Sequence, residues 1–117
     1  YGLTMSDCEL AYSSFDVPTR VFKKNRVALL LEGTIHPTQK PVALYEWLLT
    51  NYAKQGDRIL DTHLGSGSSR IAAYNLGFDF VGCEIAKDYF DKQEERFARH
   101  TAQTSLFVEG FDEQSLL

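Results

Sequence analysis

The chain has 117 residues, of which 44% are hydrophobic and 24% charged, and a formal net charge of −4. This length fits one small domain, and the composition is that of an ordinary globular protein. The longest apolar run, Val27 to Leu31, is far shorter than the roughly 20 residues that cross a bilayer, and no signal-peptide pattern opens the chain. Cys8 and Cys83 are too few for a disulfide scaffold, so we expect free thiols and a cytoplasmic setting. The negative charge excludes general attraction to nucleic acid, and any such contact must depend on a local basic patch or on other parts of the protein.

Two segments near the N-terminus are rich in β-branched, aromatic and aliphatic residues. They are CELAYSSF at 8–15 and RVFKKNRVALLL at 20–31, and Pro18 lies between them. This pattern predicts two strands joined by a turn, so residues 1–31 are expected to form a β-hairpin.

Past Pro41 the hydrophobic residues recur at helical spacing, which predicts a helix that ends before Gly56. A short buried strand, RILD at 58–61, should follow, and then a helix at 68–76 that Gly77 stops. Residues 78–84 predict a second strand and residues 88–100 an amphipathic helix. TSLFV at 104–108 is a candidate for one more strand, and the acidic residues after it predict a loose tail at 109–117.

This alternation of strands and helices predicts an α/β fold with parallel strands, flanking helices and a right-handed crossover. We expect one unit over residues 1–108. It would consist of the hairpin at 1–31 and an α/β part at 36–108.

A glycine-rich turn, DTHLGSG at 61–67, joins the first α/β strand to the next helix. Glycine lets the backbone approach a ligand closely because no Cβ intervenes. Asp61 stands at the end of the first strand and Glu84 at the end of the second. An acid at the second position is suited to accept hydrogen bonds from the two hydroxyls of a ribose, so a nucleoside ligand is predicted.

Two residues argue against a dinucleotide. Arg70 stands where the third glycine of a dinucleotide turn would be, and Asp61 would meet a pyrophosphate with a like charge. S-adenosyl-L-methionine instead carries an ammonium and a sulfonium group, which a carboxylate attracts. The sequence therefore favours S-adenosyl-L-methionine as the cofactor, with the alternative that Asp61 and Glu84 only cap the turn and the helix that follow them.

A third element, HPTQKP at 36–41, opens the first helix of the α/β part. Free backbone amides and the helix dipole favour an anion there, with Thr38 adding a hydroxyl and Lys40 a positive charge. Such a site suits the carboxylate of the methionine moiety. The alternative is a capped helix start with a solvated lysine.

These three segments together resemble motifs of the DNA amino-methyltransferases, which modify adenine at N6 or cytosine at N4. HPTQKP is similar to motif X of that family, DTHLGSGSS to motif I, and FVGCEI to motif II with its ribose-binding acid. The motifs follow the family's order over residues 36–100, and CELAYSSF resembles the region before motif X in phage-type members. Thr62 and His63 replace the usual Pro-Phe, and Ser68 the usual Thr, which affects the expected shape of the turn but not its charge pattern.

The resemblance implies a Rossmann-like, S-adenosylmethionine-dependent methyltransferase fold, of which this chain forms a part. It implies methyl transfer to a flipped base of double-stranded DNA, with adenine N6 favoured over cytosine N4. Whether the source is a restriction-modification system, a phage or a lone regulator stays open. The implied cofactor-binding residues are His36, Thr38, Lys40, Asp61, Thr62, His63, Gly65, Ser66, Gly67, Glu84 and Ile85.

The family's catalytic loop, [D/N/S]-P-P-[Y/F/W], is not found in the chain, whose prolines stand at 18, 37 and 41. By resemblance we expect the chain to be the C-terminal, cofactor-binding portion of a longer enzyme whose motifs end in the order X, I, II. We expect no catalytic residue in it and no activity from it alone.

Several residues are candidates for contact with DNA. Tyr12 or Phe15 would stack on the flipped base, although an aromatic residue in such a strand more often belongs to the core. The basic residues nearby would contact phosphates or only protect an edge strand; they are Arg20, Lys23, Lys24 and Arg26. No metal site is predicted, because the spacings of the histidines and Cys83 match no zinc pattern.

Three other interpretations stay open. The chain could be an inactive remnant that serves as a binding or interaction module and self-associates through an exposed sheet edge. A nicotinamide enzyme is disfavoured by Asp61 and Arg70. An enzyme with the same cofactor could instead act on RNA, protein or a small molecule, against which only HPTQKP and the strands before it argue.

Overall fold

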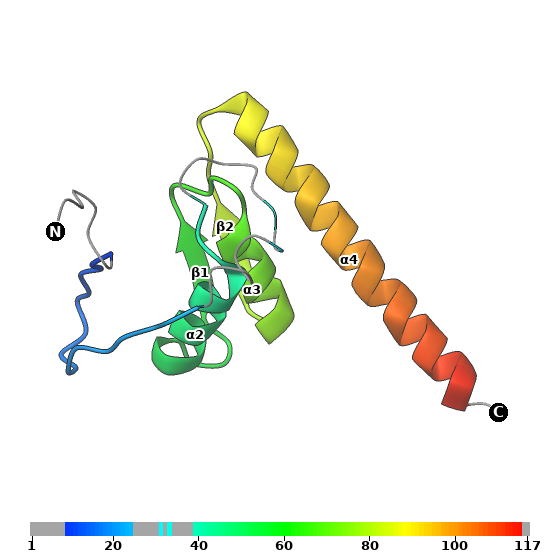
Figure 1. Ribbon diagram of the computed structural model, residues 1–117, viewed down its shortest axis with the longest axis horizontal. Coiled ribbons are helices and arrows are strands. Elements are labelled where there is room, and N and C mark those ends of the chain that lie inside the picture. The colour runs from blue at the N-terminus through cyan, green and yellow to red at the C-terminus, as the bar shows by residue number, and fades with distance from the viewer. Residues whose placement is uncertain (1–8, 25–30, 32, 34–38, 116–117) are drawn as a thin grey trace, which may run out of the picture.

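The computed structural model describes residues 9–24, 31, 33 and 39–115 of the chain. Its ordered elements are α2 (Val42–Tyr52), β1 (Arg58–Asp61), α3 (Ser68–Leu76), β2 (Asp79–Gly82) and α4 (Lys87–Ser115). β1 and β2 pair in parallel, with Asp61 opposite Gly82. The predicted α/β arrangement with parallel strands and flanking helices is confirmed for this part of the chain (Figure 1).

Local sequence signals explain where the elements begin and end. Pro41 has extended backbone angles that lead into α2, which ends at Tyr52 with Ala53 as its C-cap, before the turn that Gly56 makes with φ of 92°. Gly77 stops α3 with φ of 78°, a left-handed conformation that glycine adopts without a Cβ penalty. Both glycines were predicted as helix stops, and the bounds of β1 and α3 are those expected.

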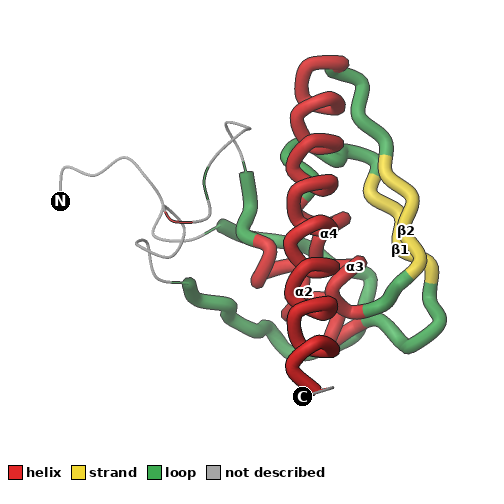
Figure 2. The backbone as a smooth tube through the Cα atoms, turned by 90° about the vertical axis from the view of Figure 1, so that its right-hand side faces the viewer, coloured by secondary structure: helices red, strands yellow, loops and turns green. Residues whose placement is uncertain are grey.

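Among the described residues, α2, α3 and α4 lie on one side of the two-stranded sheet, and no element covers its other face (Figure 2). Exposed and half-buried residues alternate along both strands, which agrees with this arrangement. On the exposed face, Leu60 is 63% exposed and its register partner Val81 is 46% exposed. Buried apolar residues among those described gather around the glycine turn and α3, and they are Leu64, Ile71, Ala72 and Ala73. The best-buried part of the structure therefore supports the turn.

The predicted N-terminal hairpin is wrong for residues 9–24, which contain no strand and run as a largely exposed, irregular segment. Two of its aromatic side chains, Phe15 and Phe22, pack on α2 and not on a neighbouring strand. The ring of Phe15 lies 5.1 Å from that of Tyr52, and Phe22 lies 5.7 Å from Trp47, between ring centroids. Residues 1–8 and 25–30 of the predicted hairpin lie outside the described residues.

Helix α4 (Lys87–Ser115) is longer than the predicted helix at 88–100 and extends away from the sheet (Figure 1). The candidate strand at 104–108 is wrong, and the segment expected to be a loose tail is helical through Ser115. A short apolar run is compatible with a strand or with a helix. Extending an existing helix costs far less free energy than nucleating a new element, so the run continues α4. Within this run the Thr104 hydroxyl donates to the His100 carbonyl four residues earlier, at 2.9 Å.

Candidate functional site

The candidate site lies where the two parallel strands end, the edge at which open α/β sheets bind ligands. β1 ends at Asp61, and β2 leads through Cys83 to Glu84. Backbone hydrogen bonds hold the two ends together: the Cys83 N–H donates to the Asp61 carbonyl at 2.9 Å, and the Leu64 N–H donates to the Cys83 carbonyl at 2.8 Å. The two acids named from the sequence therefore flank one turn.

Asp61 is half-buried, and both of its carboxylate oxygens accept hydrogen bonds. The His63 N–H donates to Oδ1 at 2.9 Å, and the Ser69 hydroxyl at the start of α3 donates to Oδ2 at 2.5 Å. Tyr45 of α2 lies near enough for electrostatic interaction, since burial and then the charge of Asp61 raise the pKa of its phenol. The sequence did not mark Tyr45 as a site residue, because its approach to Asp61 depends on tertiary packing.

Glu84 closes the turn from the second strand. Its Oε1 accepts from the Gly65 N–H at 2.9 Å and its Oε2 from the Ala86 N–H at 3.0 Å. Both acids therefore make the capping contacts that the alternative interpretation required. Ile85 follows at once with a fully exposed side chain, at 102%, which suits packing on a planar ring.

The turn itself is not arranged to hold a phosphate. Phosphate-binding turns present several free N–H groups to the anion. Here four N–H groups have internal acceptors: those of His63 and Gly65 donate to the two acids, and those of Leu64 and Gly67 donate to backbone carbonyls. The turn thus combines two carboxylates with backbone N–H groups that are largely engaged, which favours a cationic ligand over a phosphate.

The remaining residues predicted for the cofactor are placed differently. Thr62 and His63 are exposed beside the acids, where the threonine hydroxyl lies 2.9 Å from Nδ1 of the imidazole. The side chain of Ser66 is buried and meets that of Ser68 at 3.2 Å, so only its backbone belongs to the turn. Lys40 pairs with Glu9 at 2.8 Å, and His36 and Thr38 lie outside the described residues.

Arg70, which replaces the third glycine, is directed at α4. Its Nη1 donates to Glu94 at 2.7 Å and to Gln93 at 3.1 Å, and its guanidinium lies 3.8 Å from the ring centroid of Phe97. The arginine therefore fastens α3 to α4. Position 70 therefore serves helix packing, and it does not allow the close approach to a dinucleotide that a glycine would.

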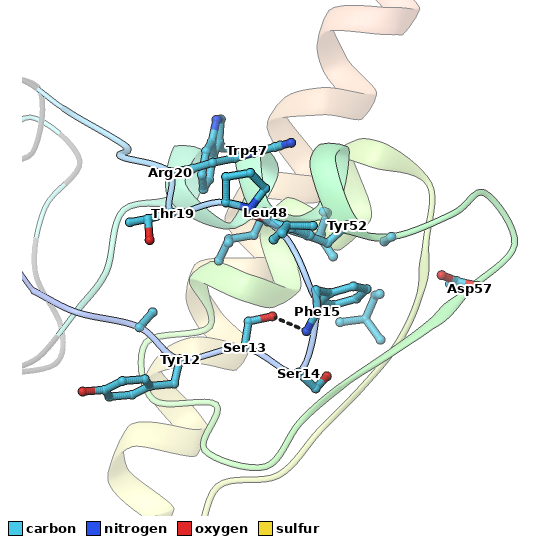
Figure 3. A pocket seen from close by; sticks show the side chains of 16 residues that line it. Tyr12, Ser13, Ser14, Phe15, Thr19, Arg20, Trp47, Leu48, Tyr52 and Asp57 are labelled. Atoms are coloured by element: carbon cyan, nitrogen blue, oxygen red, sulfur yellow. Dashed lines mark hydrogen bonds between the residues drawn. The ribbon is translucent and has the colours of Figure 1, made fainter.

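A second hollow, of about 800 Å³, lies between residues 11–20 and α2 (Figure 3). Asp57 and Ile59 at the start of β1 line it, so it is at the opposite end of that strand from Asp61. Phe15 packs on Tyr52 inside it, whereas Tyr12 is 95% exposed. We call it the aromatic groove, and its main lining side chains are Tyr12, Phe15, Arg20, Trp47 and Tyr52.

The predicted basic cluster follows the aromatic groove along the chain. Arg20 donates to Asn51 Oδ1 at 2.8 Å and lies over the ring of Tyr52. Lys23 is exposed and Lys24 half-buried, and Arg26 lies outside the described residues. These residues are separate from the acids at the strand ends. No helix among the described residues is long and apolar enough to cross a membrane.

Comparison with known proteins gives one family and several relatives. The model of a family described as DNA methylase matches residues 11–95. The type II methyltransferase M.HpaI of Haemophilus parainfluenzae is 39% identical over 61 residues, which are 52% of this chain and 19% of that protein. M2.DpnII of Streptococcus pneumoniae is 44% identical over 54 residues, 46% of this chain and 20% of that protein.

A solved structure, the complex of M1.HpyAVI with SAM, is 40% identical and superposes with a TM-score of 0.53. The match covers 56% of this chain and 32% of that one. The chain thus spans about a fifth of the length of the curated relatives and about a third of the solved one.

Proposed function

The chain belongs to the DNA methylase family, and we propose that it forms the part of such an enzyme that binds S-adenosyl-L-methionine. One observation carries the proposal. Two carboxylates, Asp61 and Glu84, flank a glycine turn whose N–H groups are largely occupied by internal acceptors. A cation is electrostatically favoured there and a phosphate is not. The complex of the solved relative with SAM supports the same ligand.

Each residue has a proposed role. Glu84, at the end of the second strand, is proposed to accept hydrogen bonds from the ribose hydroxyls, and Ile85 to pack on the adenine. Asp61, with the backbone from Thr62 to Gly67, faces the cationic methionine part. We propose that the methionine carboxylate is bound by His36, Thr38 and Lys40. Lys40 would then pair with this carboxylate and no longer with Glu9.

When bound, the cofactor supplies an electrophilic methyl group on a sulfonium. The residues of this chain hold and orient the donor, and Asp61 and Glu84 provide a negative environment for its charge. We propose that the acceptor is an exocyclic base amine in double-stranded DNA, adenine N6 in preference to cytosine N4. The chain alone would bind the donor without transferring the methyl group.

A contact with DNA is proposed for the aromatic groove and the basic residues beside it. Tyr12 has the exposure that base stacking requires, whereas Phe15 is engaged with Tyr52. Arg20, Lys23 and Lys24 would meet phosphates, in a chain whose net charge is otherwise negative. This contact would be weak in the chain alone and lost at high salt.

Isothermal titration calorimetry of the chain with S-adenosyl-L-methionine, and with its demethylated product, tests the proposal. Each acid would make a charge-assisted hydrogen bond, so Glu84→Ala and Asp61→Ala should weaken binding about 10- to 100-fold. Asp79→Ala is the matched control, because Asp79 is an exposed carboxylate at the opposite end of β2. No heat from a chain whose circular dichroism shows it folded would contradict the proposal.

A second candidate is an interaction module, favoured by the exposed apolar face around Leu60 and Val81. Parallel sheets are normally covered on both faces. This candidate predicts self-association through the sheet, which light scattering would detect. If the chain stays monomeric at all concentrations and binds ligand in the calorimeter, the interaction module is contradicted and the donor-binding function is supported.

A further inference from the structure

The back of the glycine turn is held by helix α4. Arg96 extends a guanidinium across from α4, and its Nη1 donates to the Ser66 carbonyl at 3.0 Å and to the Ser68 hydroxyl at 2.9 Å. Gln93, one turn earlier on the same helix, is 1% exposed and lies against Gly67. The turn is thus enclosed between the strand ends on one side and two polar residues of α4 on the other.

The peptide between Ser66 and Gly67 is fixed at both ends. Its carbonyl accepts from Arg96, and its N–H donates to the Leu64 carbonyl at 2.9 Å. Gly67 has φ of 80°, and glycine populates positive and negative φ about equally. Without the guanidinium, local sterics alone would not select one orientation of this peptide.

We infer that Arg96 is a positioning residue for the donor site, a role that rests on the proposed cofactor binding. It selects the peptide orientation that turns the Ser66 carbonyl toward α4 and thereby fixes the course of the turn between Asp61 and α3. Its contact is with the turn, and nothing requires it to touch the ligand. Arg96 stands outside the segments that resemble the family's motifs, so the sequence did not single it out.

Removing the Arg96 guanidinium should have two opposite effects on ligand affinity, one from its charge and one from its contacts with the turn. A cation behind the turn repels a cationic ligand, so loss of the charge alone would tighten binding of S-adenosyl-L-methionine. Loss of the geometric restraint weakens it. The demethylated product, which lacks the sulfonium, should feel the geometric effect fully and the charge effect less.

The test is calorimetry on Arg96→Met, with Arg99→Met as the control for charge because Arg99 is exposed three residues further along α4. We expect Arg96→Met to bind the demethylated product about tenfold more weakly, the change that corresponds to one charge-assisted hydrogen bond, and to bind S-adenosyl-L-methionine more weakly by a smaller factor. Faster hydrogen exchange at the Gly67 amide, with unchanged helix content, would accompany this loss. Arg99→Met should bind like the unmodified chain.

Affinity for the demethylated product within twofold of the unmodified chain, or tighter, in folded Arg96→Met would overturn the inference. If that variant does not fold, Arg96→Lys decides: it keeps the charge but its amine reaches less far than a guanidinium, so binding should weaken about threefold, and unchanged affinity would overturn the inference. Failure of the unmodified chain to bind either ligand contradicts the proposed function instead, so the two failures are distinguishable.

Discussion

Substituting Gly67 by alanine should destabilise the chain more than the same change at Gly77. Both glycines have nearly equal positive φ, 80° and 78°, so both variants carry the strain of a left-handed alanine, about 1–2 kcal/mol. They differ in their surroundings. A Cβ on Gly67 would lie 3.0 Å from Cβ and 3.2 Å from Oε1 of the buried Gln93, whereas one on Gly77 would meet nothing within 4 Å.

The added methyl group at position 67 is therefore an overpacking change as well. Such changes cost about 1–3 kcal/mol, so we expect about 2–5 kcal/mol for Gly67→Ala and about 1–2 kcal/mol for Gly77→Ala from the strain alone. The loss of chain entropy in the unfolded state is common to both variants and cancels in the difference.

Urea unfolding followed by the fluorescence of Trp47, the single tryptophan, measures the free energy of unfolding of each variant. Equal losses for the two alanine variants would refute the reasoning, because they would show that Gln93 does not confine the turn. A larger loss at Gly77 would refute it more strongly.

Two further predictions concern pH. Burial and the charge of Asp61 raise the pKa of Tyr45 in the folded chain. The contribution of Tyr45 to stability is therefore full below the ordinary tyrosine pKa and is lost as pH rises through the raised pKa. Tyr45→Phe should make the stability of the chain depend less on pH in the alkaline range, as measured by unfolding followed with circular dichroism. Hydrogen bonds from Gln93 and then Arg70 lower the pKa of Glu94, so its contribution is present above the ordinary glutamate pKa and is lost as pH falls through the lowered one. Because Glu94 is exposed, Glu94→Gln should change acid stability by less than about 1 kcal/mol, and a larger change would contradict a surface role.

Much of the α/β part could be predicted from local signals. RILD gave the bounds of β1, and Gly77 gave the end of α3, because buried strands and left-handed helix stops leave marks in a few adjacent residues. The closeness of Asp61 and Glu84 followed from parallel strand ends meeting at one edge. These features depend on short-range sequence and one topological rule.

The errors arose where partners distant in sequence decide the structure. Residues 9–24 have strand-like composition, but Phe15 and Phe22 pack on α2 and no neighbouring strand pairs with them in the described part of the chain. The length of α4 depends on helix continuation through an ambiguous apolar run. The support of the turn by Arg96 spans 30 positions along the chain, and no local pattern marks it.

The central claim is that S-adenosyl-L-methionine binds between Asp61 and Glu84. Amide chemical-shift mapping by nitrogen-15 NMR, with ligand titrated into the labelled chain, locates the binding site directly. The claim predicts shifts concentrated in residues 61–67 and 84–86, with further shifts in residues 36–40 and the aromatic groove unaffected. Shifts confined to residues 12–20 and α2, or no shifts at saturating ligand, would contradict it.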